Sequence, residues 1–156
     1  MKHILAFSGS LRKGSINSGL VRGAVELAKD HGMEIIVENI SQLPMYNQDM
    51  ETNYPSEIRA LKERISAADG IMIATPEFNR SIPGALKNMF DWTSRPYGDK
   101  SWSGKPVAVM GATPGSLGTG FAQSDVRKIL IYLNARVMGQ PEFYVGGASS
   151  KLDTDG

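Results

Sequence analysis

The sequence contains no cysteine. Disulfide bonds, thiolate metal sites and cysteine nucleophiles are therefore excluded from its chemistry. The two histidines, His3 and His31, lie far apart in the chain and have no neighbouring cluster of ligand residues, so we predict no metal site. If the protein performs redox chemistry, we expect a bound cofactor to supply the reactive group.

The chain also lacks an excess of either charge and a long hydrophobic run. Its 17 basic and 16 acidic residues give a net charge of +1, which supplies no electrostatic reason to expect nucleic acid or an anionic membrane as a partner. The apolar run from Ile4 to Phe7 is too short for a signal peptide, and no stretch approaches the length of a membrane span. We therefore expect a cytoplasmic protein.

What the chain does contain is an alternation of strand-like and helix-like patterns from one end to the other. Its 156 residues suit one domain, and no repeat, low-complexity tract or linker divides residues 1–156. Such alternation predicts a parallel sheet covered by helices on both faces. We predict strands over residues 3–7, 33–37, 70–74, 107–110 and 142–145, and helices over residues 16–28, 58–68, 83–90 and 121–133.

Three polar, glycine-rich segments each follow a predicted strand. We name them the first loop (residues 8–18), the second loop (residues 75–81) and the third loop (residues 111–120). Ligands of parallel α/β sheets bind beyond the carboxyl ends of the strands, where all three loops begin. We therefore expect the three loops to converge on one edge and to form the binding site.

The first loop has the composition of an anion site. Backbone N–H groups at the start of a helix attract an anion, and glycine permits the unusual dihedral angles that aim them. Many side-chain donors around one point favour a terminal phosphomonoester over a pyrophosphate held by backbone. These donors are hydroxyls, an amide and a guanidinium, from Ser10, Arg12, Ser15, Asn17 and Ser18.

The first loop departs from two better-known phosphate loops. Gly9 to Ser15 reads G-x-x-x-x-G-S, but Gly14 stands where an NTPase loop has its lysine. The pattern is not G-x-G-x-x-G either. Glu38 nevertheless lies about where a Rossmann unit places its ribose-binding acid, which keeps a dinucleotide-binding interpretation open. A serine-rich helix cap with a solvated arginine is the third alternative.

Longer motifs resemble the NADPH-dependent FMN reductase family of flavodoxin-like proteins, which includes quinone, azo-dye and chromate reductases. The family's G-S-x-R-x-G-S-x-N loop is matched by Gly9 to Asn17, and its P-E-Y/F-N-x-S-x-P-G-x-L-K-N-x-x-D-W motif by Pro76 to Trp92. A glycine-rich turn from Gly111 to Gly118 matches more loosely. The resemblance spans nearly the whole chain. It implies a flavodoxin-like, doubly wound α/β fold with a five-stranded parallel sheet of order 2-1-3-4-5.

The same resemblance implies an NAD(P)H-dependent oxidoreductase that contains FMN. It would use NADPH or NADH for ping-pong, two-electron reduction of small acceptors such as quinones, flavins, azo compounds or metal oxyanions. No side-chain acid or base is required, because the flavin carries the chemistry. By resemblance, the FMN phosphate would be held by Ser10, Arg12, Ser15, Asn17 and Ser18. The ring edge would be lined by Pro76, Glu77, Phe78 and Asn79 with support from Ser81, and the other side of the flavin by Thr113, Pro114 and Gly115.

One departure from the family concerns the last part of the chain. The family continues past its fifth strand into a final helix that covers one face of the sheet, whereas residues 149–156 show no helical pattern. We expect either a truncated variant or a second subunit over that face. The resemblance further implies a homodimer or homotetramer. Candidate interface residues are Trp92, Ile131 and Tyr132, with Arg127 and Glu142 as a charged pair at the rim.

Two functions of other classes stay open. A non-enzymatic flavodoxin-type electron carrier would also bind FMN, but such carriers are usually strongly acidic and place aromatic side chains against the flavin. The net charge of +1 and the P-E-F-N sequence of the second loop disfavour it. A Rossmann-type nucleotide-binding regulator without redox activity is favoured only by Glu38.

Overall fold

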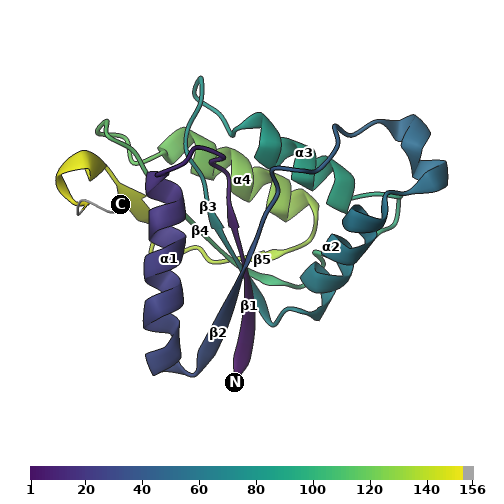
Figure 1. The fold of residues 1–156 in the computed structure, drawn as a ribbon, viewed down its shortest axis with the longest axis horizontal. Helices are drawn as coiled ribbons and strands as arrows, with labels where there is room; N and C mark the ends of the chain where they lie inside the picture. Colours follow the sequence, from purple (N-terminus) through teal and green to yellow (C-terminus); the bar gives the residue numbers. More distant parts are fainter. Residues whose placement is uncertain (153–156) are drawn as a thin grey trace.

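A twisted parallel sheet runs through the middle of the protein, with helices on both of its faces (Figure 1). The computed structural model describes residues 1–152. The strands are β1 (Lys2–Ser8), β2 (Met33–Glu38), β3 (Gly70–Ala74), β4 (Pro106–Ala112), β5 (Arg136–Val137) and β6 (Phe143–Val145). The helices are α1 (Ile16–Ala28), α2 (Ser56–Ala67), α3 (Gly84–Thr93) and α4 (Gly120–Tyr132), with short 3-10 helices η1 (Lys29–His31), η2 (Gln48–Asn53) and η3 (Ala148–Ser150).

The strand order is β2-β1-β3-β4-β5, and every pair is parallel, which confirms the predicted order 2-1-3-4-5. The fifth position differs from the prediction of one strand over residues 142–145. It holds two short strands: β5 pairs with the start of β4 and β6 pairs with its end. Gly139 and Pro141 lie between them, and proline has no backbone N–H to donate to a ladder. The last strand is therefore interrupted rather than continuous.

The two faces of the sheet are covered unequally. On one face, α2, α3 and α4 bury alternate strand residues such as Phe7, Ile73 and Val109 in a large apolar cluster. On the other, α1 packs a small cluster of Ala6, Val21 and Ala74, against which Met72 and Met110 are only partly buried. The thicker layer supplies most of the burial that stabilises the fold, at roughly 1.5–3 kcal/mol for each large side chain.

After β6 the described chain makes only η3, a single 3-10 turn, and residues 153–156 of the predicted non-helical segment lie outside the described residues. Within residues 1–152, no helix has both the length and the apolar character needed to cross a membrane. In the same part of the chain, no three histidine, aspartate or glutamate side chains gather in a way that could hold a metal ion.

Candidate functional site

The carboxyl ends of β1, β3 and β4 lie level with one another, so the three loops start side by side. Ser8 is in register with Ala74, and Ala74 is in register with Met110. Backbone hydrogen bonds extend this alignment past the strands, because Gly9 N–H donates to Ala74 O (2.8 Å) and Thr75 N–H donates to Met110 O (3.0 Å). The expected convergence of the three loops on one edge is observed.

Two glycines allow the loops to touch. A Cβ atom at Gly9 would lie 3.1 Å from Pro76 Cδ and 3.1 Å from Pro83 Cγ, which is tighter than an ordinary contact. A Cβ atom at Gly111 would lie 2.6 Å from the carbonyl oxygen of Thr75. Any side chain at either position would separate the second loop from its neighbours.

Asn17 joins the first loop to the third. Its Nδ2 donates to Ala112 O (3.0 Å), and its Oδ1 accepts from Ala112 N–H (2.9 Å). The side chain is buried, at 3% exposed. The structure thus uses this amide to hold the two loops together, and the phosphate contact that the family resemblance implies for Asn17 stays a prediction.

Glu77 joins the second loop to α4. Its Oε2 accepts from the N–H groups of Phe121 (2.9 Å) and Ala122 (3.2 Å). These are donors of the first helical turn, which have no partner within the helix. The carboxylate also faces the positive end of the helix dipole. The Glu77 side chain therefore fixes the second loop against α4.

A tight turn forms the tip of the second loop. Phe78 and Ser81 exchange two backbone hydrogen bonds of 3.0 Å, and the residues between them, Asn79 and Arg80, both have positive φ (52° and 66°). The Ser81 hydroxyl donates to Asp125 Oδ2 on α4 (2.6 Å). This tether supports the turn, and Phe78, Asn79 and Arg80 are exposed at the edge of the site.

The segment that includes β6 supports the third loop from outside. Thr113 N–H donates to Val145 O (2.9 Å), and Gly115 O accepts from Gly147 N–H (2.9 Å). Thr113 is half-buried, whereas Pro114 and Gly115 are exposed. The third loop is thus held by backbone bonds and exposes Pro114 and Gly115 to solvent.

A cavity of ≈ 350 Å³ opens beside the first loop. Ser8 Oγ and Ser18 Oγ lie 3.0 Å apart on its wall. Neither Arg12 nor Lys13 forms a hydrogen bond or an ion pair with any residue in the described range 1–152. Three hydroxyls and two uncompensated cations around one cavity form a donor set suited to a phosphate. The first-loop side of the cavity is lined by Ser8, Ser10, Leu11, Arg12, Lys13 and Ser18.

The residues predicted to hold a phosphate divide into two groups. Ser10, Arg12 and Ser18 line the cavity, whereas Ser15 and Asn17 turn inward. Ser15 is 2% exposed, and its hydroxyl oxygen caps α1 by accepting from Ser18 N–H (3.2 Å). Ser15 and Asn17 therefore shape the loop, while the other three face the space that a ligand would fill.

Ser8 and Lys13 line the cavity although the sequence did not single them out. Ser8 ends β1, directly before Gly9, and its hydroxyl could have indicated a further phosphate donor in the sequence. Lys13 follows Arg12, so its basic character inside an anion-binding loop was visible as well.

Glu38 borders the same cavity, but its carboxylate is paired. Arg64 on α2 donates to both carboxylate oxygens, with 3.0 Å between Nη2 and Oε2, and the Glu38 side chain is only 11% exposed. A carboxylate held in this two-point bond is not free to bind ribose hydroxyls. The observation that favoured a Rossmann-type regulator is therefore removed.

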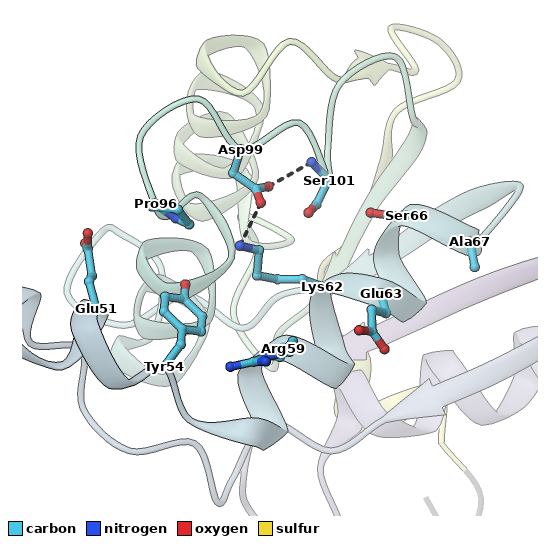
Figure 2. A pocket seen from close by; sticks show the side chains of 10 residues that line it. All are labelled: Glu51, Tyr54, Arg59, Lys62, Glu63, Ser66, Ala67, Pro96, Asp99 and Ser101. Carbon is cyan, nitrogen blue, oxygen red and sulfur yellow. Dashed lines mark hydrogen bonds and ion pairs between the residues drawn. The ribbon is translucent and has the colours of Figure 1, made fainter.

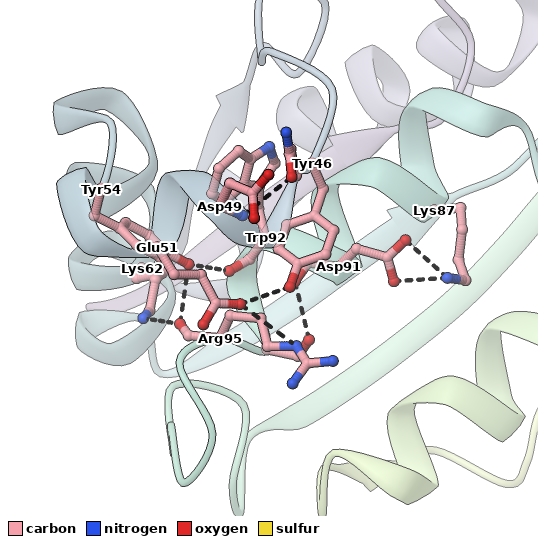
Figure 3. Close-up of polar contacts among 11 residues, drawn as sticks. Tyr46, Asp49, Glu51, Tyr54, Lys62, Lys87, Asp91, Trp92 and Arg95 are labelled. Atoms are coloured by element: carbon pink, nitrogen blue, oxygen red, sulfur yellow. Dashed lines mark hydrogen bonds and ion pairs between the residues drawn. The ribbon is translucent and has the colours of Figure 1, made fainter.

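A second polar cluster lies between α2, α3 and the segment after α3 (Figure 3). Tyr54 O–H donates to the carbonyl oxygens of Trp92 and Arg95, the latter at 3.0 Å. Burial, reinforced by the nearby carboxylates of Asp99 and Glu51, raises the pKa of Tyr54, so the phenol keeps its proton and remains a donor. We name this cluster the Tyr54 network and define it as Tyr46, Glu51, Tyr54, Lys62, Trp92, Arg95 and Asp99.

The Tyr54 network borders a larger cavity of ≈ 750 Å³ between α2 and residues 96–101 (Figure 2). Lys62 Nζ reaches Asp99 Oδ2 at 2.7 Å, with side chains 14% and 15% exposed, and Asp99 also accepts from Ser101 N–H (2.8 Å). None of the residues that line this cavity belongs to the three loops. Its size does not make it the reaction site, because its central charges satisfy each other.

The model of the NADPH-dependent FMN reductase family matches residues 2–150 of this chain. The chain belongs to this family. It is 44% identical to a 2-hydroxy-1,4-benzoquinone reductase from Burkholderia sp over 149 residues, which are 95% of this chain and 80% of that protein. It is 40% identical to an NAD(P)H-dependent FMN reductase from Pseudomonas aeruginosa over 154 residues, 98% of this chain and 82% of the relative.

A solved structure agrees with this family assignment. FerB, a flavoenzyme NAD(P)H:(acceptor) oxidoreductase from Paracoccus denitrificans, superimposes with a TM-score of 0.92 at 38% identity, covering 99% of this chain and 85% of that one. The flavodoxin-like fold is confirmed, and so is the prediction of an NAD(P)H-dependent oxidoreductase with FMN as its cofactor.

Proposed function

We propose that the chain holds the FMN phosphate in the cavity beside the first loop and the isoalloxazine ring against the second and third loops. The observation that carries this proposal is the pair of uncompensated cations, Arg12 and Lys13, among the hydroxyls of the first loop. A phosphomonoester carries a charge of about −1.5 to −2 near pH 7, which these two cations match. Ser10 and Ser18 complete the donor set, with Ser8 beside them.

The second and third loops fit a planar ring. In this proposal Pro76 to Asn79 form one wall and Thr113 to Gly115 form the other. It is supported by the Glu77 carboxylate, which bonds to α4, and by the backbone bonds that hold Thr113 and Gly115. Rigid loops of this kind keep backbone donors aimed at a fixed point, which avoids reorganisation during the reaction. When bound, FMN supplies hydride acceptance from NADPH or NADH and hydride delivery to the acceptor. The exposed Pro114 and Gly115 leave that side open to both co-substrates in turn.

Quinones are the acceptor class that we propose. The Burkholderia relative is named for the reduction of a benzoquinone, and the FerB name specifies NAD(P)H and an unspecified acceptor. We propose the cytoplasm as the location and small molecules as the reaction partners, with no role for nucleic acid or membrane.

Anaerobic stopped-flow mixing tests this function. The purified protein should be yellow, should bleach within seconds of mixing with NADPH or NADH, and should regain its colour when a quinone is added. Double-reciprocal plots across quinone concentrations should give parallel lines. Free FMN at the same concentration is the control. If both nucleotides bleach the protein only over hours, the reductase function is wrong and the electron-carrier alternative replaces it.

We further propose that the protein is a homodimer or homotetramer. The apolar side chains of Ile131 and Tyr132 on α4 are 68% and 78% exposed, which supports α4 as an interface. Trp92 is 0% exposed, so it belongs to the core and the expectation that it contributes to an interface is wrong. Light scattering of the FMN-bound protein should give at least twice the mass of one chain, and the mass of a single chain would overturn this proposal.

In a single chain, the two members of the suggested rim pair have other partners. Arg127 donates to Met138 O, and Glu142 accepts from Tyr144 O–H at 2.8 Å. Pairing between Arg127 of one subunit and Glu142 of another stays a prediction.

A further inference from the structure

Arg80 occupies a backbone conformation that its residue type disfavours. With Asn79 it forms the two-residue turn of the second loop, at φ values of 66° and 52°. Turns with positive φ at both central positions favour glycine at the second one, because a Cβ atom is strained there. A glycine would fit this turn without strain, so the presence of arginine points to a use for its side chain.

The Arg80 side chain is held in position by an aromatic contact and not by an ion pair or a hydrogen bond from the described residues 1–152. Its guanidinium carbon lies 5.2 Å from the centre of the Phe121 ring, at the start of α4. Stacking on an aromatic face orients the planar guanidinium and leaves its N–H donors at the edge. Within residues 1–152, Arg80 forms neither a hydrogen bond nor an ion pair.

The acidic groups near Arg80 are already compensated. Glu77 accepts two backbone N–H groups of α4. Asp125 is bound by Lys128 (2.7 Å) and Ser81 (2.6 Å), and these two hydrogen bonds lower its pKa. Arg12 and Lys13 face the cavity proposed for the FMN phosphate. We name the edge formed by the first, second and third loops the loop edge. Arg80 is therefore a cation of the loop edge that remains available after the phosphate has been neutralised.

Exposed apolar side chains lie next to Arg80. Phe78 and Phe121, which flank Arg80 in the turn and on α4, are 55% and 51% exposed, and Leu117 of the third loop is 50% exposed. Exposed aromatic faces next to a guanidinium suit a flat ring that carries an anionic substituent. A nicotinamide dinucleotide carries its charge on phosphates separated from the ring by a sugar, which matches this arrangement less well.

We propose that Arg80 is a specificity-determining residue that favours acceptors combining a planar ring with a negatively charged substituent. This inference rests on the proposed reductase function, because it assumes that acceptors bind at the loop edge. It adds a charge preference that quinone reduction alone does not require.

The test compares a sulfonated naphthoquinone with menadione, which has a similar ring and no charge. Arg80→Gly removes the charge and relaxes the turn, so the fold is retained, whereas Arg80→Lys keeps the charge. Arg59→Gln is the matched control, since it removes one exposed positive charge from α2, outside the three loops. For each quinone, the kcat/KM of a variant is divided by that of the wild type with the same quinone, which cancels the difference in redox potential between the two quinones.

We expect Arg80→Gly to lower kcat/KM for the sulfonated quinone by about fivefold and to leave menadione unchanged to within about twofold, the size expected for an exposed ion pair. Arg80→Lys should retain most of the preference, Arg59→Gln should retain all of it, and added salt should reduce the preference of the wild type. If Arg80→Gly slows both quinones equally, or raises only the KM for NADPH, the proposal is wrong.

A binding measurement separates this proposal from the reductase function. Naphthalene sulfonate cannot be reduced, and its binding to the FMN-bound protein can be followed by calorimetry. The wild type should bind it about fivefold more tightly than Arg80→Gly, whatever the rate of quinone turnover. Equal binding by the two proteins would overturn the role of Arg80, whereas absent turnover with unequal binding would overturn only the proposed reaction.

Discussion

Positively charged side chains have opposite surroundings in the Tyr54 network and at the loop edge. In the Tyr54 network, Lys62 is bound to Asp99 and to the carbonyl oxygen of Arg95, and the Arg95 guanidinium lies 4.0 Å from a Glu51 carboxylate oxygen. At the loop edge, Arg12 and Arg80 have no such partners within the part of the chain that the structure describes. Both regions are rich in polar groups, and the Tyr54 network borders the larger cavity.

The difference separates a structural role from a binding role. A charge that is compensated within the chain is part of the fold, because removing its partner leaves a poorly solvated ion. A charge held in place without compensation by the chain can be compensated by a ligand. By this criterion we expect the loop edge to bind an anion, whereas the Tyr54 network holds residues 46–54 against α3.

The largest effect should come from breaking the Tyr54 network. Asp99→Ala leaves the Lys62 ammonium, 14% exposed, without its carboxylate and should reduce the free energy of unfolding by roughly 2–3 kcal/mol. Urea unfolding measures this loss. Asp91→Ala is the control, since it breaks an exposed i,i+4 pair with Lys87 and should cost at most about 0.5 kcal/mol. FMN affinity should be the same in both variants. A large loss of FMN affinity in Asp99→Ala alone would contradict the purely structural role of the Tyr54 network.

The same carboxylate gives a pH dependence. Burial disfavours the charged form of Asp99, but the hydrogen bonds from Lys62 and Ser101 outweigh it and lower its pKa. A lowered folded-state pKa means that the stabilisation is fully present above the unfolded value of about 3.9. It declines below that value and is lost as the pH falls through the lowered pKa of the folded state. The stability difference between wild type and Asp99→Asn should therefore shrink below about pH 4. A constant difference down to pH 3 would contradict this assignment.

A substitution at Asn17 should have a smaller effect on stability. It tests, within the loop edge, whether a side chain holds the loops in position or contacts the ligand. Asn17→Ala leaves the buried backbone groups of Ala112 unpaired and should cost about 1–2 kcal/mol of unfolding free energy. It should also weaken FMN binding, because the first and third loops lose their link. Arg12→Ala should weaken FMN binding without a loss of stability. If Asn17→Ala lowers FMN affinity at full stability, its amide contacts the ligand directly and the positioning role is wrong.

The arrangement of the loop edge could be predicted from the sequence because it depends on strand order. Alternating strands and helices predict parallel strands, and residues that follow parallel strands share one edge. The direction in which each side chain points could not be predicted. Asn17 matches a motif position, but its partner Ala112 lies 95 residues away. Glu77 likewise meets the α4 amides 44 and 45 residues further along the chain.

Two other differences between the sequence-based predictions and the structure have identifiable causes. The split of the last strand reflects Gly139 and Pro141, which were visible in the sequence, although their effect depends on pairing with β4. The compensation of Glu38 by Arg64 could not be read from spacing, because the two residues belong to different elements that pack together only in the fold. Residue types in the loops predict the chemistry of the candidate site, and packing determines which of these side chains line the cavity beside the first loop.

Calorimetric titration of the apoprotein with FMN and with riboflavin, for wild type and Arg12→Ala, tests the phosphate assignment most directly. The two ligands share the ring and differ in the phosphate. Arg12→Ala should weaken FMN binding by one to two orders of magnitude, since a charge-assisted hydrogen bond contributes about 1.5–3 kcal/mol, and should leave riboflavin affinity unchanged. If the variant binds FMN as tightly as the wild type, or loses FMN and riboflavin affinity equally, the first loop does not hold the phosphate.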